Sequence, residues 1–183
     1  LHANFSLEKN GGAVVLTAAS GTTTLDSVTY PELDTDLAYG RDLAGHWTFL
    51  EPTPHTVNAA PTYLGWLKQL DWSHPRGFYE TPFTLTLTNH SPGATVLYSL
   101  DGSEPALSYA NGVAISSTKA LRAKVVRTGY KPSRSQTKTF IFLDDVIANA
   151  NMSATIKNNA AYAPRLRPGL LALPTISLCV PGQ

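Results

Sequence analysis

Hydrophobic and polar residues alternate with a period of two through much of the segment between residues 74 and 142. Phe83, Leu85 and Leu87 fall on one side of an extended chain, and the threonines between them fall on the other. The same alternation recurs at Val96–Tyr98–Leu100, Val113–Ile115, Leu121–Ala123–Val125 and Thr137–Thr139–Ile141. About six strands at intervals of about ten residues predict a β-sandwich.

Turn residues separate these strands. Pro92-Gly93 lies at the centre of one turn, and Gly129-Tyr130-Lys131-Pro132 forms another. Asp101-Gly102 is a strong signal for a tight hairpin turn directly after the strand at 96–100.

The first 60 residues carry a weaker strand pattern. Short extended segments are expected around Phe5 and Leu7 and at residues 13–17, 22–30, 39–42 and 45–49. The prolines at 52 and 54 end regular structure. About four strands are few for an independently stable sandwich. Residues 1–60 are therefore predicted to form a partial sandwich.

Two segments remain outside the sandwiches. Residues 61–73 are too short for their periodicity to separate helix from strand, and they are predicted to be a connector. The last segment, 143–183, is predicted to be a C-terminal extension. A short helix is expected at 143–150, with Asp144 and Asp145 in its first turn, and a buried strand at 170–180. The predicted fold class is all-β.

The 74–142 segment contains five distinctive motifs, which are Arg76-Gly77-Phe78-Tyr79, Pro92-Gly93-Ala94-Thr95, Tyr98-Ser99-Leu100-Asp101-Gly102-Ser103-Glu104-Pro105, Leu121-Arg122-Ala123 and Gly129-Tyr130-Lys131-Pro132-Ser133. In this order they resemble the chitobiase C-terminal-like domain, a fibronectin-III-associated domain of bacterial secreted proteins. The resemblance implies an immunoglobulin-like, fibronectin-III-like sandwich that serves as an accessory module. It implies no catalytic residues.

The first 60 residues contain a second set of motifs, at Leu1 to Leu7, Tyr39-Gly40-Arg41-Asp42, Pro52-Thr53-Pro54 and Asn58. These motifs resemble the second half of a lamin-tail-like domain. The segment at 171–178 is similar to the start of a further domain, so the chain is expected to be an internal fragment of a large bacterial surface protein. Exposed strand edges at residues 1–30 or 170–180 would then favour a homodimer.

Composition excludes several classes of function. A net charge of +1 provides no electrostatic footprint for nucleic acid. No apolar run reaches the roughly 18 residues of a membrane span. The single Cys179 excludes an internal disulfide and a cysteine-based metal cluster. Charged residues make up 15% of the chain, and the chain is rich in Thr, Ser, Asn and Gly, which predicts an extracellular or cell-surface location.

No residue pattern predicts a catalytic site, a metal site or a cofactor. The stretch Asp101-Gly102-Ser103-Glu104 offers oxygen ligands for calcium, but a capped turn is the favoured interpretation, and the same holds for the acidic loop at 32–36. The five histidines form no pair with metal-ligand spacing. A Gly-x-Ser-x-Gly elbow and a phosphate-binding glycine loop are both missing from the sequence.

Aromatic residues are the remaining candidates for ligand binding. Trp66 and Trp72 lie in the predicted connector and are predicted to bind ligand, whereas Trp47 is assigned to the core. The predicted function is a non-catalytic accessory or binding module that faces carbohydrate, with a polysaccharide as partner. The alternatives are a small hydrolase with a site at the inter-domain cleft and a purely structural spacer.

Overall fold

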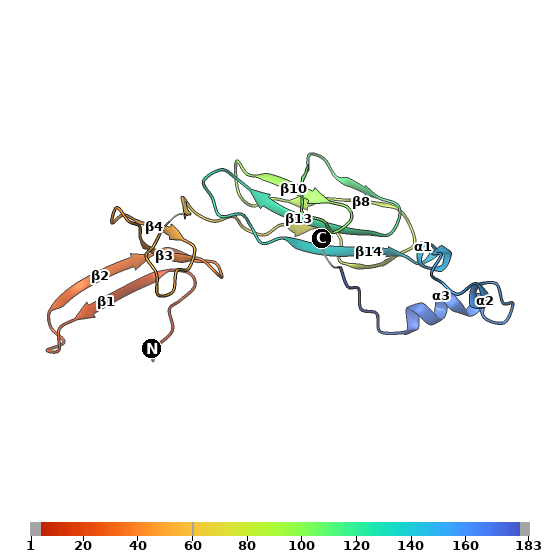
Figure 1. Ribbon diagram of the computed structural model, residues 1–183, viewed down its shortest axis with the longest axis horizontal. Helices are drawn as coiled ribbons and strands as arrows, with labels where there is room; N and C mark the ends of the chain where they lie inside the picture. Colours follow the sequence, from red (N-terminus) through yellow and green to blue (C-terminus); the bar gives the residue numbers. More distant parts are fainter. Residues whose placement is uncertain (1–4, 60, 180–183) are drawn as a thin grey trace. The chain divides into compact units, whose positions relative to one another are not determined.

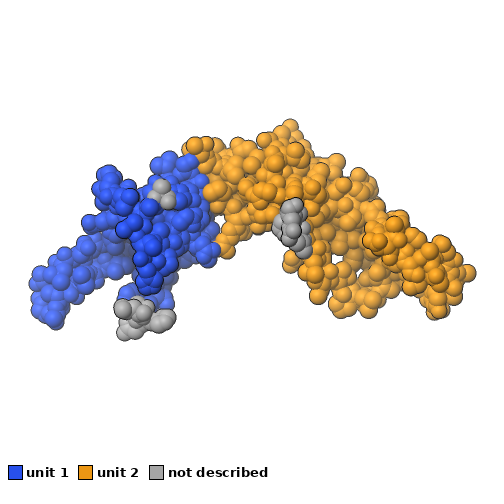
Figure 2. Space-filling view, in the orientation of Figure 1, with its two compact units in different colours: residues 1–66, 129–131 blue, residues 67–128, 132–183 orange. Residues whose placement is uncertain are grey.

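The computed structural model describes residues 5–59 and 61–179. The chain forms two compact units, which are coloured separately in Figure 2. Unit 1 comprises residues 1–66 together with 129–131, and unit 2 comprises residues 67–128 and 132–183. The motif residues 1–4 and residue 180 of the predicted C-terminal strand lie outside the described part of the chain.

Strands dominate the described chain, and helices make up only 11% of it, which confirms the all-β prediction. The strands are β1 (Gly12–Thr17), β2 (Thr24–Tyr30), β3 (Ala38–Arg41), β4 (Trp47–Leu50), β5 (Thr62–Tyr63), β6 (Asp71–Trp72), β7 (Gly77–Tyr79), β8 (Phe83–Leu85), β9 (Leu87–Thr88), β10 (Thr95–Ser99), β11 (Leu107–Ser108), β12 (Val113–Ile115), β13 (Lys119–Val126) and β14 (Gln136–Phe142). The helices are α1 (Leu143–Ala148), α2 (Ala154–Lys157) and α3 (Ala163–Ala172).

Unit 1 contains two small antiparallel sheets, the hairpin β1–β2 and the three-stranded sheet β3–β4–β5. Its core is small and consists of Tyr30, Leu37 and Leu50 among the described residues. Residues 129–131 join this unit through backbone hydrogen bonds, from Leu64 N to Gly129 O at 2.8 Å and from Lys131 N to Gly65 O at 2.9 Å.

The main sheet of unit 2 has five strands in the order β11–β10–β13–β14–β7, and its central strands β10, β13 and β14 are labelled in Figure 1. All its pairings are antiparallel except that of β7 with β14, which is parallel. Two short antiparallel ladders, β8–β12 and β6–β9, complete the strands of this unit.

The core of unit 2 lies between the five-stranded sheet and the short ladders. The ring of Phe140 on β14 is fully buried and lies 5.5 Å from the ring of Phe83 on β8, centroid to centroid. Tyr79 on β7 contacts both rings, at 5.8 Å and 4.4 Å. The other buried apolar residues of the two layers are Leu85, Leu87, Val96, Val113, Ile115, Leu121, Ala123, Val125 and Phe142. The alternation recognised in the sequence thus identifies the inward-facing residues of β8, β12 and β13. On β14 the buried residues are Phe140 and Phe142, and Thr139 and Ile141 alternate with them on the other face.

The tight hairpin expected at Asp101-Gly102 does not form. The strand that pairs with β10 begins only at Leu107. The loop before it is held by its own side chains, because the Asp101 carboxylate accepts hydrogen bonds from the Ser103 amide at 3.0 Å and from its hydroxyl at 2.5 Å. Pro105 lacks the amide hydrogen that a hairpin strand needs in its ladder.

The short helix predicted at 143–150 is confirmed by α1, but the strand predicted at 170–180 is wrong. Residues 163–172 form α3, and residues 173–179 form no ladder. Pro164 lies in the first turn of α3, a position that proline tolerates, and Pro174 follows its end. The strand expected around Phe5 and Leu7 is also wrong. Residues 5–8 form no strand, and the side chains of Phe5 and Leu7 are exposed.

Phe140→Ala is expected to destabilise unit 2 by about 3–5 kcal/mol, because it leaves a cavity beside Phe83 and Tyr79. Urea unfolding followed by near-ultraviolet circular dichroism measures the change. Leu107→Ala, at a half-exposed position on the edge strand β11, is the control and should cost less than about 0.5 kcal/mol. Equal costs for the two variants would contradict this placement of the core.

Candidate functional site

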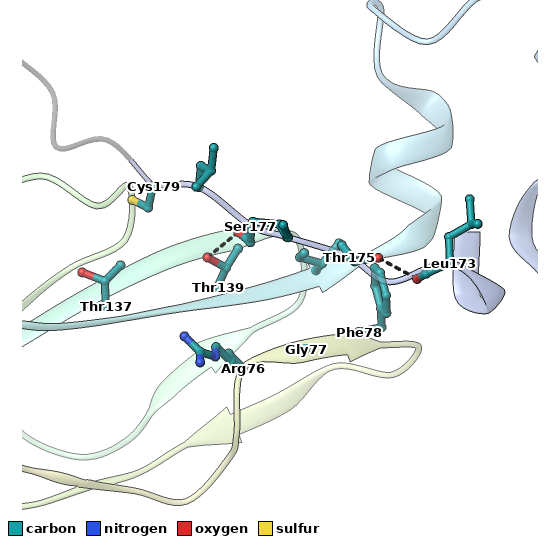
Figure 3. A pocket seen from close by; sticks show the side chains of 12 residues that line it. Arg76, Gly77, Phe78, Thr137, Thr139, Leu173, Thr175, Ser177 and Cys179 are labelled. Atoms are coloured by element: carbon teal, nitrogen blue, oxygen red, sulfur yellow. Dashed lines mark hydrogen bonds between the residues drawn. The ribbon is translucent and has the colours of Figure 1, made fainter. Parts of the chain in front are cut away.

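Unit 2 has a groove on the outer face of β14 and β7, with a volume of about 780 Å³ (Figure 3). Because Phe140 and Phe142 point into the core, the residues of β14 at odd-numbered positions point outward. Thr137, Thr139 and Ile141 therefore form the floor. Phe78 of β7 lies opposite Ile141 in the parallel register and extends the floor sideways.

The wall of the groove is the extended segment 173–179, which lies above β14 (Figure 3). The Ser177 hydroxyl lies 2.9 Å from the hydroxyl of Thr139 and ties this segment to the floor. The Thr175 hydroxyl donates to the Leu173 carbonyl at 3.3 Å. Ile176 and Leu178 are more than four-fifths exposed. The segment therefore contributes both hydroxyl groups and apolar side chains to the lining of the groove, and the apolar side chains of Ile176 and Leu178 are also open to solvent.

The lining of the groove is suited to binding a polar polymer. It combines an aromatic ring, an aliphatic floor and several hydroxyl groups, and Arg76 lies at its margin. No described carboxylate lies within ion-pair distance of Arg76. A sugar ring presents an apolar face edged by hydroxyls, which matches such a surface. The described lining has no carboxylate or imidazole for proton transfer.

Trp72, predicted to bind ligand, is half-buried on β6 in unit 2. It lies opposite the buried Leu87 in the β6–β9 ladder. Its indole N–H donates to the side-chain oxygen of Gln136 at 2.9 Å, and the ammonium group of Lys138 lies 5.1 Å from the ring centroid. Burial lowers the pKa of Lys138, and Arg76 lowers it further. Part of the Trp72 ring surface is therefore occupied by its own neighbours.

Trp66, the other predicted residue, belongs to unit 1 and is also half-buried. Its indole N–H donates to the Glu32 carbonyl at 3.2 Å, and its backbone forms a bridge with Lys131. The two predicted tryptophans thus lie in different units. Trp47, which sequence reasoning assigned to the core, is 41% exposed.

The acidic loops considered for calcium are occupied by protein groups. Glu104 forms ion pairs with Arg122 at 3.1 Å and with Lys124, and the pKa of its carboxyl is lowered chiefly by Lys124. Asp34 pairs with Lys9 at 3.4 Å. Among the residues that the structure describes, no three His, Cys, Asp or Glu side chains gather closely enough to hold a metal ion.

Three of the described histidines make separate contacts with different neighbours. His90 Nε2 lies 2.6 Å from the Asp71 carboxylate, and His46 Nδ1 lies 3.7 Å from that of Asp42. His74 stacks on Phe83, with centroids 4.2 Å apart, and its Nδ1 lies 2.8 Å from the Ser73 hydroxyl. The Ser73 oxygen also accepts the Thr86 amide at 2.9 Å. Ser73 and His74 therefore help to hold the edge of the short ladders.

Residues 74–139 match the model of the chitobiase/beta-hexosaminidase C-terminal domain family. This match confirms the resemblance recognised in that segment, and it includes the floor of the groove up to Thr139. The domain is a non-catalytic accessory domain of carbohydrate-active enzymes. No curated protein matches the chain, and no solved structure matches it either. None of the helices in the described ranges is long and apolar enough to cross a membrane.

Unit 1 contains a charged cluster that makes its stability depend on pH. The Glu51 carboxylate accepts hydrogen bonds from Lys131 at 2.9 Å and from the Tyr63 hydroxyl at 2.8 Å. The Lys131 hydrogen bond is the main cause of the lowered pKa of Glu51, and the Tyr63 hydrogen bond adds to it. Burial, followed by the Glu51 contact, raises the pKa of Tyr63. Ionised Glu51 is thus favoured in the folded state.

Glu51→Gln is expected to weaken unit 1 at pH 7 but much less at pH 3. A lowered folded-state pKa gives stability that is present above the unfolded value of about 4.3 and is lost as pH falls through the folded value. Because Glu51 is partly exposed, the loss at pH 7 should be of the order of 0.2–1 kcal/mol. Urea unfolding at both pH values measures it, with Glu8→Gln at an exposed position as the control. An equal loss at both pH values would refute the assignment.

Proposed function

We propose that this chain is a non-catalytic accessory module of an extracellular or cell-surface protein, and that it binds polysaccharide through the groove on β14 and β7. The observation that carries the proposal is the match of residues 74–139 to an accessory domain of carbohydrate-active enzymes. The face-to-face arrangement of a five-stranded sheet and short ladders supports an immunoglobulin-like sandwich as the form of this module.

The geometry of the groove supports a neutral or weakly polar glycan as ligand. Phe78 and Ile141 provide an apolar surface against which a sugar ring can lie, and the hydroxyls of Thr137 and Thr139 stand beside it. These side chains project from paired strands, so little conformational freedom is lost when a ligand binds.

Phe78→Ala is expected to weaken polysaccharide binding about tenfold, because loss of one aromatic contact is worth about 1.4 kcal/mol. Affinity electrophoresis of the full chain in gels that contain soluble neutral polysaccharides measures it, with pull-down on insoluble chitin in parallel. Leu107→Ala is the matched control, at an exposed position on the far edge strand β11 of the same sheet.

The same experiment with Trp66→Ala and Trp72→Ala tests the sequence-based prediction that these two tryptophans bind ligand. Loss of binding in either variant, with Phe78→Ala unaffected, would move the proposed site away from the groove. Turnover of a generic ester substrate above a heat-inactivated control would favour the hydrolase alternative. If the chain shows no binding and no turnover, the structural spacer becomes the better interpretation.

A further inference from the structure

The sheet β3–β4–β5 of unit 1 carries aromatic side chains on the face opposite to its core. Leu50 is buried on the inner face, so Phe49, its neighbour along β4, points to the other face. The antiparallel register places Tyr39 opposite Phe49, Arg41 opposite Trp47, and Phe49 opposite Tyr63. An outer sheet face is normally polar, so this row calls for a function.

Three of these groups pack into a stacked cluster. The rings of Tyr39 and Trp47 are nearly parallel, with centroids 5.5 Å apart, and the Arg41 guanidinium carbon lies 5.3 Å from the Trp47 centroid. Phe49 contacts Tyr39 edge-on at 5.4 Å. Stacking on an aromatic ring holds a guanidinium group by its face and leaves its in-plane N–H groups free to bind an anion.

Arg41 is exposed and has no ion-pair partner among the described residues. The neighbouring Asp42 is committed elsewhere, since its carboxylate accepts the amides of Ala44 and His46, each at 2.9 Å. The hydrogen bond from the His46 amide is the main cause of the lowered pKa of Asp42. The nearest described acidic side chain along this strand is therefore already satisfied by its own turn.

The backbone beneath Arg41 is held in place by a second set of contacts. The side-chain amide of Asn58 donates to the Arg41 carbonyl at 2.8 Å, and the Thr53 hydroxyl donates to Asn58 at 2.6 Å. A Cβ atom at Gly40 would lie 3.2 Å from the Asn58 nitrogen, so glycine permits this close approach. The guanidinium group thus projects from a rigid strand.

We propose that Arg41 and Trp47 form a second binding site, which recognises the carboxylate group of an acidic polysaccharide. The Arg41 fork would pair with the carboxylate, and the exposed parts of Trp47 and Tyr39 would contact the sugar ring. The choice of a polysaccharide as the carrier of the carboxylate rests on the proposed function. The anion site itself rests only on unit 1 and does not use the groove.

Affinity electrophoresis of the full chain in polygalacturonate gels tests this site. Retardation of the wild-type chain is expected, and it should weaken as salt is raised, because the site is exposed. Arg41→Gln and Trp47→Ala should each weaken binding about tenfold, which corresponds to about 1.4 kcal/mol. Arg41→Lys should retain only part of it. Leu43→Ala, at an exposed position of the same β3–β4 loop, is the matched control and should bind as the wild type does.

Unchanged binding in Arg41→Gln, or equal retardation by fully methyl-esterified pectin, would overturn the proposal. Equal or tighter binding of polyglutamate would also overturn it, because the ligand class would then be an acidic polypeptide. Phe78→Ala separates the two sites. Its binding to neutral polysaccharide should fall while its binding to polygalacturonate persists, so failure of the groove and failure of the Arg41 site give different results.

Discussion

The position of β14 between two hydrogen-bonded neighbours is the constraint on which unit 2 depends. Pairing with β13 on one edge and β7 on the other fixes the strand, so its successive side chains must lie on opposite faces of the sheet. Phe140 and Phe142 consequently enter the core, and Thr139 and Ile141 form the floor of the groove. The same seven residues that stabilise the module therefore also shape the surface that a ligand can reach.

Side chains also alternate between the two faces of the sheet in unit 1, but there the larger ones lie on the face away from the core. Its three-stranded sheet places small residues and Leu50 on the inner face, and it places larger aromatic residues on the outer face. The core is correspondingly small. Lys131 forms an ion pair with Glu51, and the backbone of residues 129–131 pairs with residues 64–66. The stability of this unit should accordingly depend on pH.

The sequence predicts the structure well where burial of one face of a strand determines which side chains alternate. The inward residues of β8, β13 and β14 follow directly from period two, and α1 follows from its acidic first turn. It failed where a local pattern competes with other interactions. At Asp101 the carboxylate caps its own loop, which replaces the tight hairpin. At 170–173 an apolar run without alternation was assigned to a strand, but Leu170, Leu171 and Ala172 are good helix formers and continue α3 beyond Pro168 and Gly169.

The candidate sites were harder to predict than the fold. Trp47 lies in an alternating segment, and alternation alone does not reveal which face of a two-layer protein is buried. Trp47 is exposed because Leu50 takes the buried face of β4, and residues three positions apart in a strand lie on opposite faces. The groove was missed because Thr137, Thr139 and Ile141, which form its floor, are ordinary residues for a strand, and its wall comes from residues more than 30 positions later in the chain.

The parallel pairing of β7 with β14 also determines when the module can fold during synthesis. Residues 77–79 are made early, but their only strand partner in the described structure is residues 140–142. Until the last of these leaves the ribosome, β7 is an unpaired edge and Tyr79 and Phe83 lack the ring of Phe140. The nascent chain therefore exposes apolar residues of its core until β14 has been made, and a chaperone that binds extended apolar segments would bind it in that interval.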